Sequence, residues 1–195
     1  MNLRATCQLA IIVLLAAAII PASVGAATLK KHKSDAGGFA VLIPESWNVN
    51  ETQDAFSYEG IFTAQQNAEH GSFEYGLRVA RIVGWKESLQ LEATIIKDAA
   101  LEYANRLATA TGGSTPMVIS GGKENYGIQL YYFRILTALG SEHNCDHMLL
   151  LVGVKKETWF EALWKSPCSD SDSQADISRM RASLKVDSRW TPMEK

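Results

Sequence analysis

HMLLLVGVKKETWFEALWK, residues 147–165, is the stretch that decides the fold. An apolar run over residues 147–154 predicts a buried strand, residues 155–157 (KKE) predict a charged turn, and residues 158–165 predict a second strand that returns beside the first. A connection of this length joins antiparallel neighbours, because parallel strands need a crossover of a dozen or more residues. The sheet is therefore predicted to be antiparallel at this point.

The strands around this hairpin are apolar on both faces. The returning strand places Phe160, Ala162 and Trp164 on one face and Trp159 and Leu163 on the other. Residues 125–137 (NYGIQLYYFRILT) alternate in the same way and predict a central strand. A sheet with two apolar faces needs a covering layer on each side. We therefore interpret the many aromatic side chains as core, with a ligand groove or a protein interface as the alternative.

Strands and helices are predicted in separate groups along the rest of the chain. A strand over residues 39–43 ends at Pro44, and residues 56–66 and 72–83 form a hairpin. A helix runs from an N-cap at Ser88 to about Thr109 and ends at Gly112-Gly113. The other predicted elements are a strand over residues 117–120, a turn at Gly121-Gly122, and a last helix that begins at Asp172 or Ser173. This order favours an α+β sandwich over a doubly wound parallel sheet.

A family resemblance is carried by GGFAVLIPESWNV (residues 37–49), the helix after the first hairpin, the paired long strands and a last helix ending in SLKV (residues 183–186). In these features the chain resembles the PsbP-like exported domains, including the bacterial DcrB-like group. The resemblance covers about residues 37–187. It implies an α/β/α sandwich around a mainly antiparallel sheet, usually without catalytic activity. Members of the wider family serve as accessory subunits or as partners of other proteins, and no shared catalytic set can be carried over to this chain.

The first 26 residues predict a secretory signal. Arg4 is the charged region, residues 9–20 are an apolar run too short to span a bilayer, and small residues precede a cut after Ala26. The predicted organisation is a signal (1–26), a flexible leader (27–36), a single α+β domain (37–187) and a tail (188–195). The mature protein is then periplasmic or secreted, with a membrane anchor formed by an uncleaved signal as the alternative.

The charge balance argues against a nucleic-acid partner. The chain has 19 Lys plus Arg against 21 Asp plus Glu, and loss of Arg4 with the signal makes the mature chain slightly more acidic. Nucleic-acid binding calls for a basic face instead. The one basic cluster, Lys30, Lys31 and Lys33, lies in the predicted leader and is interpreted as solvated charge.

Cys145 and Cys168 remain after removal of the signal and predict a disulfide, since an even cysteine count is typical of exported domains. If Val154 pairs with Thr158, the hairpin brings Cys145 opposite Pro167, within one residue of Cys168. A bridge across the hairpin is then geometrically reasonable, and it would stabilise the fold by roughly 3 kcal/mol.

The same segment carries the alternative hypothesis of a metal site. On an extended strand His143, Cys145 and His147 share one face, and imidazole and thiolate are ligands of zinc and copper. This site requires a reduced Cys145. A disulfide removes the central ligand and leaves the two histidines about 13 Å apart, too far to share one ion.

No catalytic motif is found: the chain has no nucleophile elbow, no HExxH and no phosphate-binding glycine loop. We therefore expect a non-catalytic protein without a cofactor, which binds another envelope or secreted protein. A metal-binding protein and an unrecognised hydrolase are the alternatives.

Overall fold

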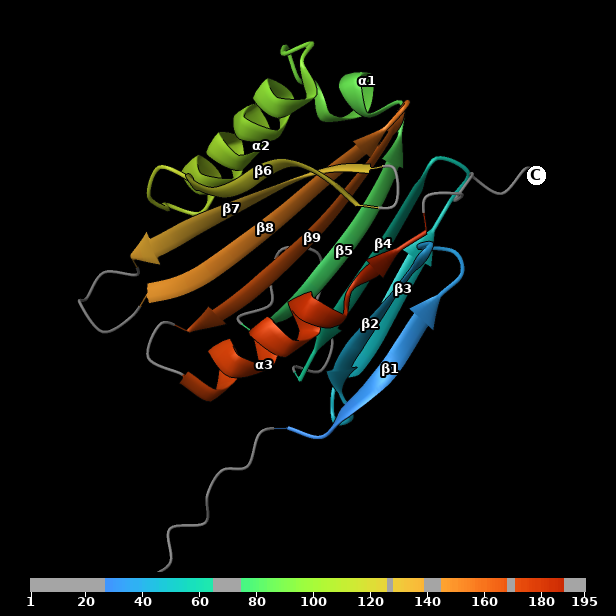
Figure 1. Cartoon of the computed structure of the whole chain (residues 1–195), viewed down its shortest axis with the longest axis vertical. Helices are drawn as coiled ribbons and strands as arrows, with labels where there is room; N and C mark the ends of the chain where they lie inside the picture. Colours follow the sequence, from blue (N-terminus) through green and yellow to red (C-terminus); the bar gives the residue numbers. More distant parts are fainter. Residues whose placement is uncertain (1–26, 65–74, 126–127, 139–144, 168–170, 188–195) are drawn as a thin grey trace, which may run out of the picture.

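The computed structural model describes residues 27–64, 75–125, 128–138, 145–167 and 171–187 (Figure 1). These residues form three helices and ten strands. The strands are β1 (Leu29–Ser34), β2 (Phe39–Pro44), β3 (Asn48–Gln53), β4 (Ser57–Thr63), β5 (Gly76–Val83), β6 (Met117–Asn125), β7 (Ile128–Ala138), β8 (Cys145–Lys155), β9 (Thr158–Pro167) and β10 (Lys185–Val186). The helices are α1 (Trp85–Leu89), α2 (Ile96–Ala110) and α3 (Ser171–Ser183).

The strands form two sheets, and every pairing is antiparallel. The large sheet has seven strands in the order β3-β4-β5-β9-β8-β7-β6, and the small sheet has three in the order β1-β2-β10. The predicted α+β class and antiparallel sheet are confirmed. The central strands β9 and β8 are those of the 147–165 hairpin, which explains why that stretch is apolar on both faces.

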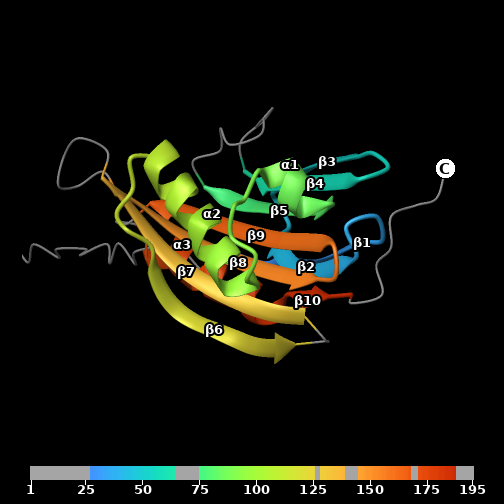
Figure 2. The ribbon, with the colours of Figure 1, turned by 90° about the horizontal axis from the view of Figure 1, so that it is seen from above.

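The large sheet separates two hydrophobic cores. Trp159 and Leu163 pack in a core with α1 and α2, in which Ala99, Ala100 and Ala104 are fully buried. Phe160 and Trp164 pack on the opposite face against β2, β10 and α3. Figure 2 shows α2 lying across β8 and β7, and Figure 1 shows α3 with the small sheet over the other face. The predicted sandwich is present, with a mixed outer layer of one helix and three strands on one side.

The register of the β8–β9 hairpin differs by one residue from the one assumed. Val154 pairs with Trp159 rather than Thr158, and the last pair outward is Asp146 with Pro167. The reason is a two-residue loop: Lys156 takes the left-handed conformation with φ 54° and lets Lys155 pair directly with Thr158. The expectation that Cys145 lies opposite Pro167 is therefore wrong.

The predicted flexible leader contains a strand. β1 pairs along its whole length with β2, from Leu29 opposite Pro44 to Ser34 opposite Phe39. The three lysines that indicated a solvated leader lie on an edge strand, where lysine is a common protection against further pairing. His32 is turned inward, and its ring lies 4.9 Å from that of Phe62, centroid to centroid.

The predicted single helix over residues 88–109 is broken into α1 and α2. Gln90 ends α1 in the left-handed conformation, with φ 51°, and Leu91 is buried in the core beneath α2. The Glu102 carboxylate accepts hydrogen bonds from the backbone N–H groups of Glu92 and Ala93, at 3.0 Å each, which fixes the linker to α2. Ser88 is consequently not the N-cap of the long helix, which begins after Ile95. Gly112, with φ 65°, follows α2 as predicted.

The predicted turn at Gly121-Gly122 lies inside β6. The pairing of β6 with β7 shifts register between Val118 and Ser120 and again between Ser120 and Lys123. Glycines are typical of such irregular strand positions, because they tolerate the altered backbone. Two adjacent glycines therefore mark a bulged edge strand here.

β10 closes the small sheet with the last described residues of the chain. Lys185 and Val186 pair with Ala40 and Phe39 of β2. The buried Arg81 guanidinium of β5 donates to the carbonyls of Gly37 and Asp187, at 2.9 and 3.2 Å. The two ends of the folded chain are thus attached to each other and to the large sheet. In the described ranges no helix has the length and apolar character needed to cross a membrane.

Candidate functional site

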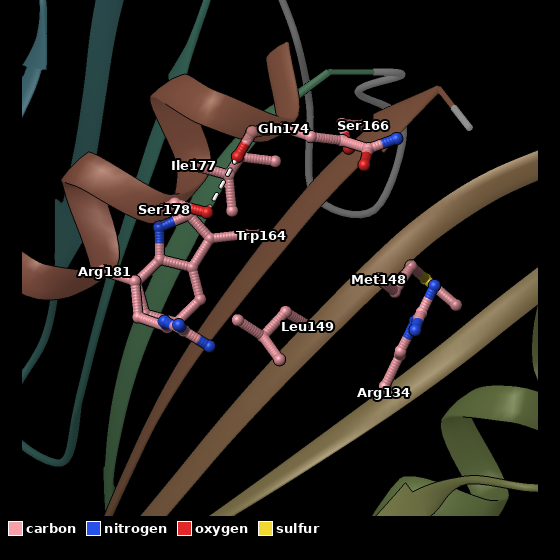
Figure 3. A pocket seen from close by; sticks show the side chains of 9 residues that line it. All are labelled: Arg134, Met148, Leu149, Trp164, Ser166, Gln174, Ile177, Ser178 and Arg181. Carbon is pink, nitrogen blue, oxygen red and sulfur yellow. Dashed lines mark hydrogen bonds between the residues drawn. The ribbon is translucent and has the colours of Figure 1, made fainter. Parts of the chain in front are cut away.

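A pocket of about 300 Å³ lies between α3 and the large sheet, where β7, β8 and β9 run past the helix (Figure 3). Strands supply its floor and α3 supplies one wall. The residues that line it are Arg134, Met148, Leu149, Trp164, Ser166, Gln174, Ile177, Ser178 and Arg181. The volume is at the lower end of the range for small-molecule sites.

Strand register brings most of the floor to one face of the sheet. Arg134 is directly opposite Leu149, and Leu149 is directly opposite Trp164, so the three side chains form a row across β7, β8 and β9. Ser166 follows two residues after Trp164 and shares its face. The sequence places each of these residues on a strand, but only the register places them together.

Two side chains of the floor have buried donor groups without a partner. Trp164 Nε1 and Ser166 Oγ make no hydrogen bond within the described part of the chain, and both residues are 0% exposed. Leaving a buried donor unsatisfied costs about 1–3 kcal/mol. Trp159, on the opposite face of β9, differs because its Nε1 donates to Glu161 Oε2 at 3.0 Å.

The charge around the pocket is positive. Arg134 on β7 and Arg181 on α3 lie on either side of Leu149 in Figure 3, and none of the nine lining residues is acidic. The α3 neighbour Arg179 forms an ion pair with Asp176. Arg181, by contrast, makes no ion pair with a described residue. The arrangement can bind an acceptor group with negative charge.

A second polar cluster joins the small sheet to the large one. His32 Nε2 lies 3.0 Å from Glu51 Oε1, and the Tyr58 hydroxyl donates to the same oxygen at 2.6 Å. Burial alone would raise the pKa of Glu51, but the hydrogen bonds from Tyr58 and His32 outweigh it and hold that pKa below its ordinary value of 4.5. The His32 ring is packed beside Phe39 and Phe62, so we interpret this cluster as a contact that holds β1 against β3 and β4.

A third polar cluster is buried under α2. Glu161 is 0% exposed and accepts from the Arg78 guanidinium and from Trp159 Nε1, while Glu59 accepts from Arg78 on its other side. Burial alone would lower the pKa of Arg78, but Glu161 and Glu59 raise it above its ordinary value. Because every member of this cluster is paired with another member, we interpret the cluster as a contact that stabilises the fold.

The predicted cysteine and metal sites fall largely outside the described residues. Cys145 begins β8, where its backbone pairs with Ala138, whereas Cys168 lies outside the described ranges. The disulfide between Cys145 and Cys168 therefore stays a prediction. His143 also lies outside, so the site formed by His143, Cys145 and His147 is untested, and the described residues contain no other cluster of metal ligands.

Comparison with known proteins finds no matching family model and no match among curated proteins. Solved structures do match. Cyanobacterial PsbP (CyanoP) from Synechocystis sp. PCC 6803 is similar with a TM-score of 0.53 and 14% identity, over 84% of this chain and 95% of that one. The chain therefore has a PsbP-like α+β fold, as the resemblance of residues 37–187 implied.

Two further solved structures are similar at lower scores. LpqN of Mycobacterium tuberculosis, described as involved in cell envelope biogenesis, gives a TM-score of 0.44 at 7% identity over 82% of this chain and 91% of that one. A protein of unknown function from Pseudomonas aeruginosa, described as a putative regulator, gives 0.39 at 10% identity over 86% and 99%.

Proposed function

We propose that this chain is an exported, non-catalytic accessory protein that binds another envelope or secreted protein. Export follows from the signal-like residues 1–26. The absence of enzymatic activity is proposed because no catalytic motif is present in the sequence, and because the polar clusters of the described residues join secondary-structure elements to one another. PsbP-like domains are usually non-catalytic, which is consistent with this proposal.

The observation that carries the binding proposal is an exposed apolar surface at one edge of the large sheet. We call Met117 on β6 and Leu136 on β7 the β6–β7 edge surface; they are 54% and 37% exposed. Met117 is directly opposite Arg134, and Leu136 follows Arg134 by two residues, so both share the sheet face of the pocket. Figure 1 shows that α3 does not extend over β6 and β7.

The two edges of the large sheet differ in composition. β3, at the other edge, has the sequence NVNETQ and is exposed along its whole length, with Val49 as its one apolar side chain. Polar edge strands discourage pairing with other chains. The β6–β7 edge surface instead combines the apolar side chains of Met117 and Leu136 with the neighbouring cation Arg134 of β7, a composition that is typical of protein interfaces.

The test is site-specific photocrosslinking in the compartment to which the chain's own signal directs it. A photoreactive residue replaces Met117 in one variant and Ile95 in the control. Ile95 is 63% exposed but lies at the start of α2, in the layer on the opposite face of the sheet. We expect one protein to be crosslinked from position 117, not from position 95, and to be lost when Leu136→Asp is added.

Equal crosslinking from both positions, or a product that survives Leu136→Asp, would contradict the proposal. Turnover of any substrate that a single polar substitution abolishes would contradict its non-catalytic part.

A further inference from the structure

We propose that the pocket between α3 and β7–β9 binds a small organic anion, namely a carboxylate or phosphate group carried on an apolar body. This inference goes beyond the proposed function, because it concerns a small molecule and not the protein partner. It rests on three properties of the pocket: unsatisfied donors, positive charge and an apolar wall.

The donors call for an acceptor. The indole N–H of Trp164 can only donate, and the hydroxyl of Ser166 can donate as well as accept. Most buried polar groups in proteins are hydrogen-bonded, so two unsatisfied donors two residues apart on the floor of one pocket call for an explanation. An oxygen that enters the pocket from outside the chain supplies the missing acceptor.

The charge calls for an anionic acceptor. Arg134 and Arg181 both line the pocket, and none of the lining residues that the structure describes is a carboxylate. Arg181 makes no ion pair with a described residue, whereas Arg179, two positions before it on α3, is paired with Asp176. Guanidinium groups bind carboxylate and phosphate oxygens through charge-assisted hydrogen bonds.

The remaining wall calls for an apolar body. Leu149 from β8, Ile177 from α3 and Met148 all line the pocket (Figure 3). An inorganic anion alone leaves this wall without a partner. An anion carried on an alkyl or aromatic group can bind the donors and arginines with its charged end and the apolar wall with its body. Small-molecule sites usually combine an apolar lining with a few polar groups in this way.

Entry of the ligand involves side chains of α3. Trp164 Nε1 and Ser166 Oγ lie beneath the surface of the floor, and Gln174 and Ser178 project from the helix beside them (Figure 3). Ser178 donates to the Gln174 carbonyl at 3.0 Å and is exposed. Because both donors are buried, the proposed binding requires side chains at the edge of the pocket, such as those of Gln174 and Ser178, to move when the ligand enters.

The test is calorimetric titration of the mature chain with octanoate and with octyl phosphate. We expect both to bind, and neutral 1-octanol and inorganic phosphate to bind at least tenfold more weakly. The anion that binds more tightly shows whether the pocket prefers a carboxylate or a phosphate group. The proposal is supported whichever of the two binds more tightly. Binding of 1-octanol as tight as that of octanoate, or no binding of either anion up to millimolar concentration, would overturn it.

Matched variants locate the binding. Ser166→Ala and Trp164→Phe each remove one donor and are expected to weaken octanoate binding roughly tenfold or more, as is Arg181→Gln. Trp159→Phe and Arg179→Gln make the same changes outside the pocket and are expected to leave affinity unchanged. Full affinity in all three pocket variants would refute the site. Leu136→Asp, which lies outside the pocket lining, separates the two proposals, since it is expected to abolish the protein crosslink from position 117 and to retain octanoate binding.

Discussion

Loss of the Glu161 charge is expected to destabilise this fold more than any substitution at an exposed acid. Glu161 is 0% exposed, whereas the side chains of its neighbours Arg78 and Glu59 are 12% and 25% exposed. Glu161→Gln keeps the volume and an acceptor for Trp159, but leaves Arg78 with Glu59 as its remaining counterion. Breaking a buried ion pair costs about 3–5 kcal/mol, and the remaining pair with Glu59 places the expected loss near 3 kcal/mol.

Urea unfolding at neutral pH measures this loss. With a slope of about 2 kcal/mol per molar urea, a loss of about 3 kcal/mol lowers the midpoint by about 1.5 M without changing the slope. Glu157→Gln, at an exposed position of the β8–β9 loop, is the matched control and is expected to shift the stability by less than about 0.5 kcal/mol.

A double variant separates loss of the ion pair from damage to the core. Arg78→Met combined with Glu161→Gln removes both buried charges, and we expect it to be at least as stable as Glu161→Gln alone. A midpoint of Glu161→Gln within 0.3 M of the unmodified chain would refute the reasoning. A double variant whose losses simply add would refute it as well.

Three further predictions concern other parts of the chain. Reduction of the predicted Cys145–Cys168 disulfide is expected to lower the free energy of unfolding by roughly 3 kcal/mol, and an unchanged urea midpoint in reductant would contradict the predicted bridge. Since the pKa of Glu51 is lowered in the folded state, its stabilising contribution is complete above about pH 4.5 and is lost as the pH falls through the lowered pKa. Glu51→Gln removes the charged acceptor of Tyr58, so its urea midpoints from pH 6 to 3 are expected to fall less steeply than those of the unmodified chain; parallel curves would contradict this. Gln90→Gly relieves a left-handed residue with φ 51° and is expected to raise the stability by up to about 1 kcal/mol, whereas a lower melting temperature would contradict it.

The central strands could be predicted from sequence because their pattern is local. Alternating apolar residues in residues 158–165 correctly divide Trp159 and Leu163 from Phe160 and Trp164, the two sets that pack in different cores. The local sequence pattern predicts the wrong structure where a contact with a distant part of the chain determines the conformation. β1 is a strand because β2 lies beside it, and α1 ends at Gln90 because Leu91 turns into the core.

The pocket could not be predicted from sequence. Its donors, Trp164 and Ser166, look like ordinary strand residues, and its two arginines lie 47 positions apart on β7 and α3. What distinguishes Trp164 from Trp159 is the partner of the indole N–H, and that partner is visible only in three dimensions. The sequence predicts a disulfide or a metal site around Cys145 and His147 because thiol and imidazole groups lie close together in the chain, and that prediction needs no knowledge of the fold.

The place of β10 has a consequence for when the domain can fold. The middle strand of the small sheet, β2, is among the first parts of the domain to be synthesised, while one of its two neighbours is the last described strand. While the chain is still emerging from a ribosome or a membrane pore, residues 185–186 are not yet available. The side of β2 that pairs with β10 is then exposed at Phe39. Native packing of β2 must wait for the arrival of the C-terminal segment. If the chain is exported as proposed, this late closure leaves the small sheet incomplete until the C-terminal segment has crossed the membrane.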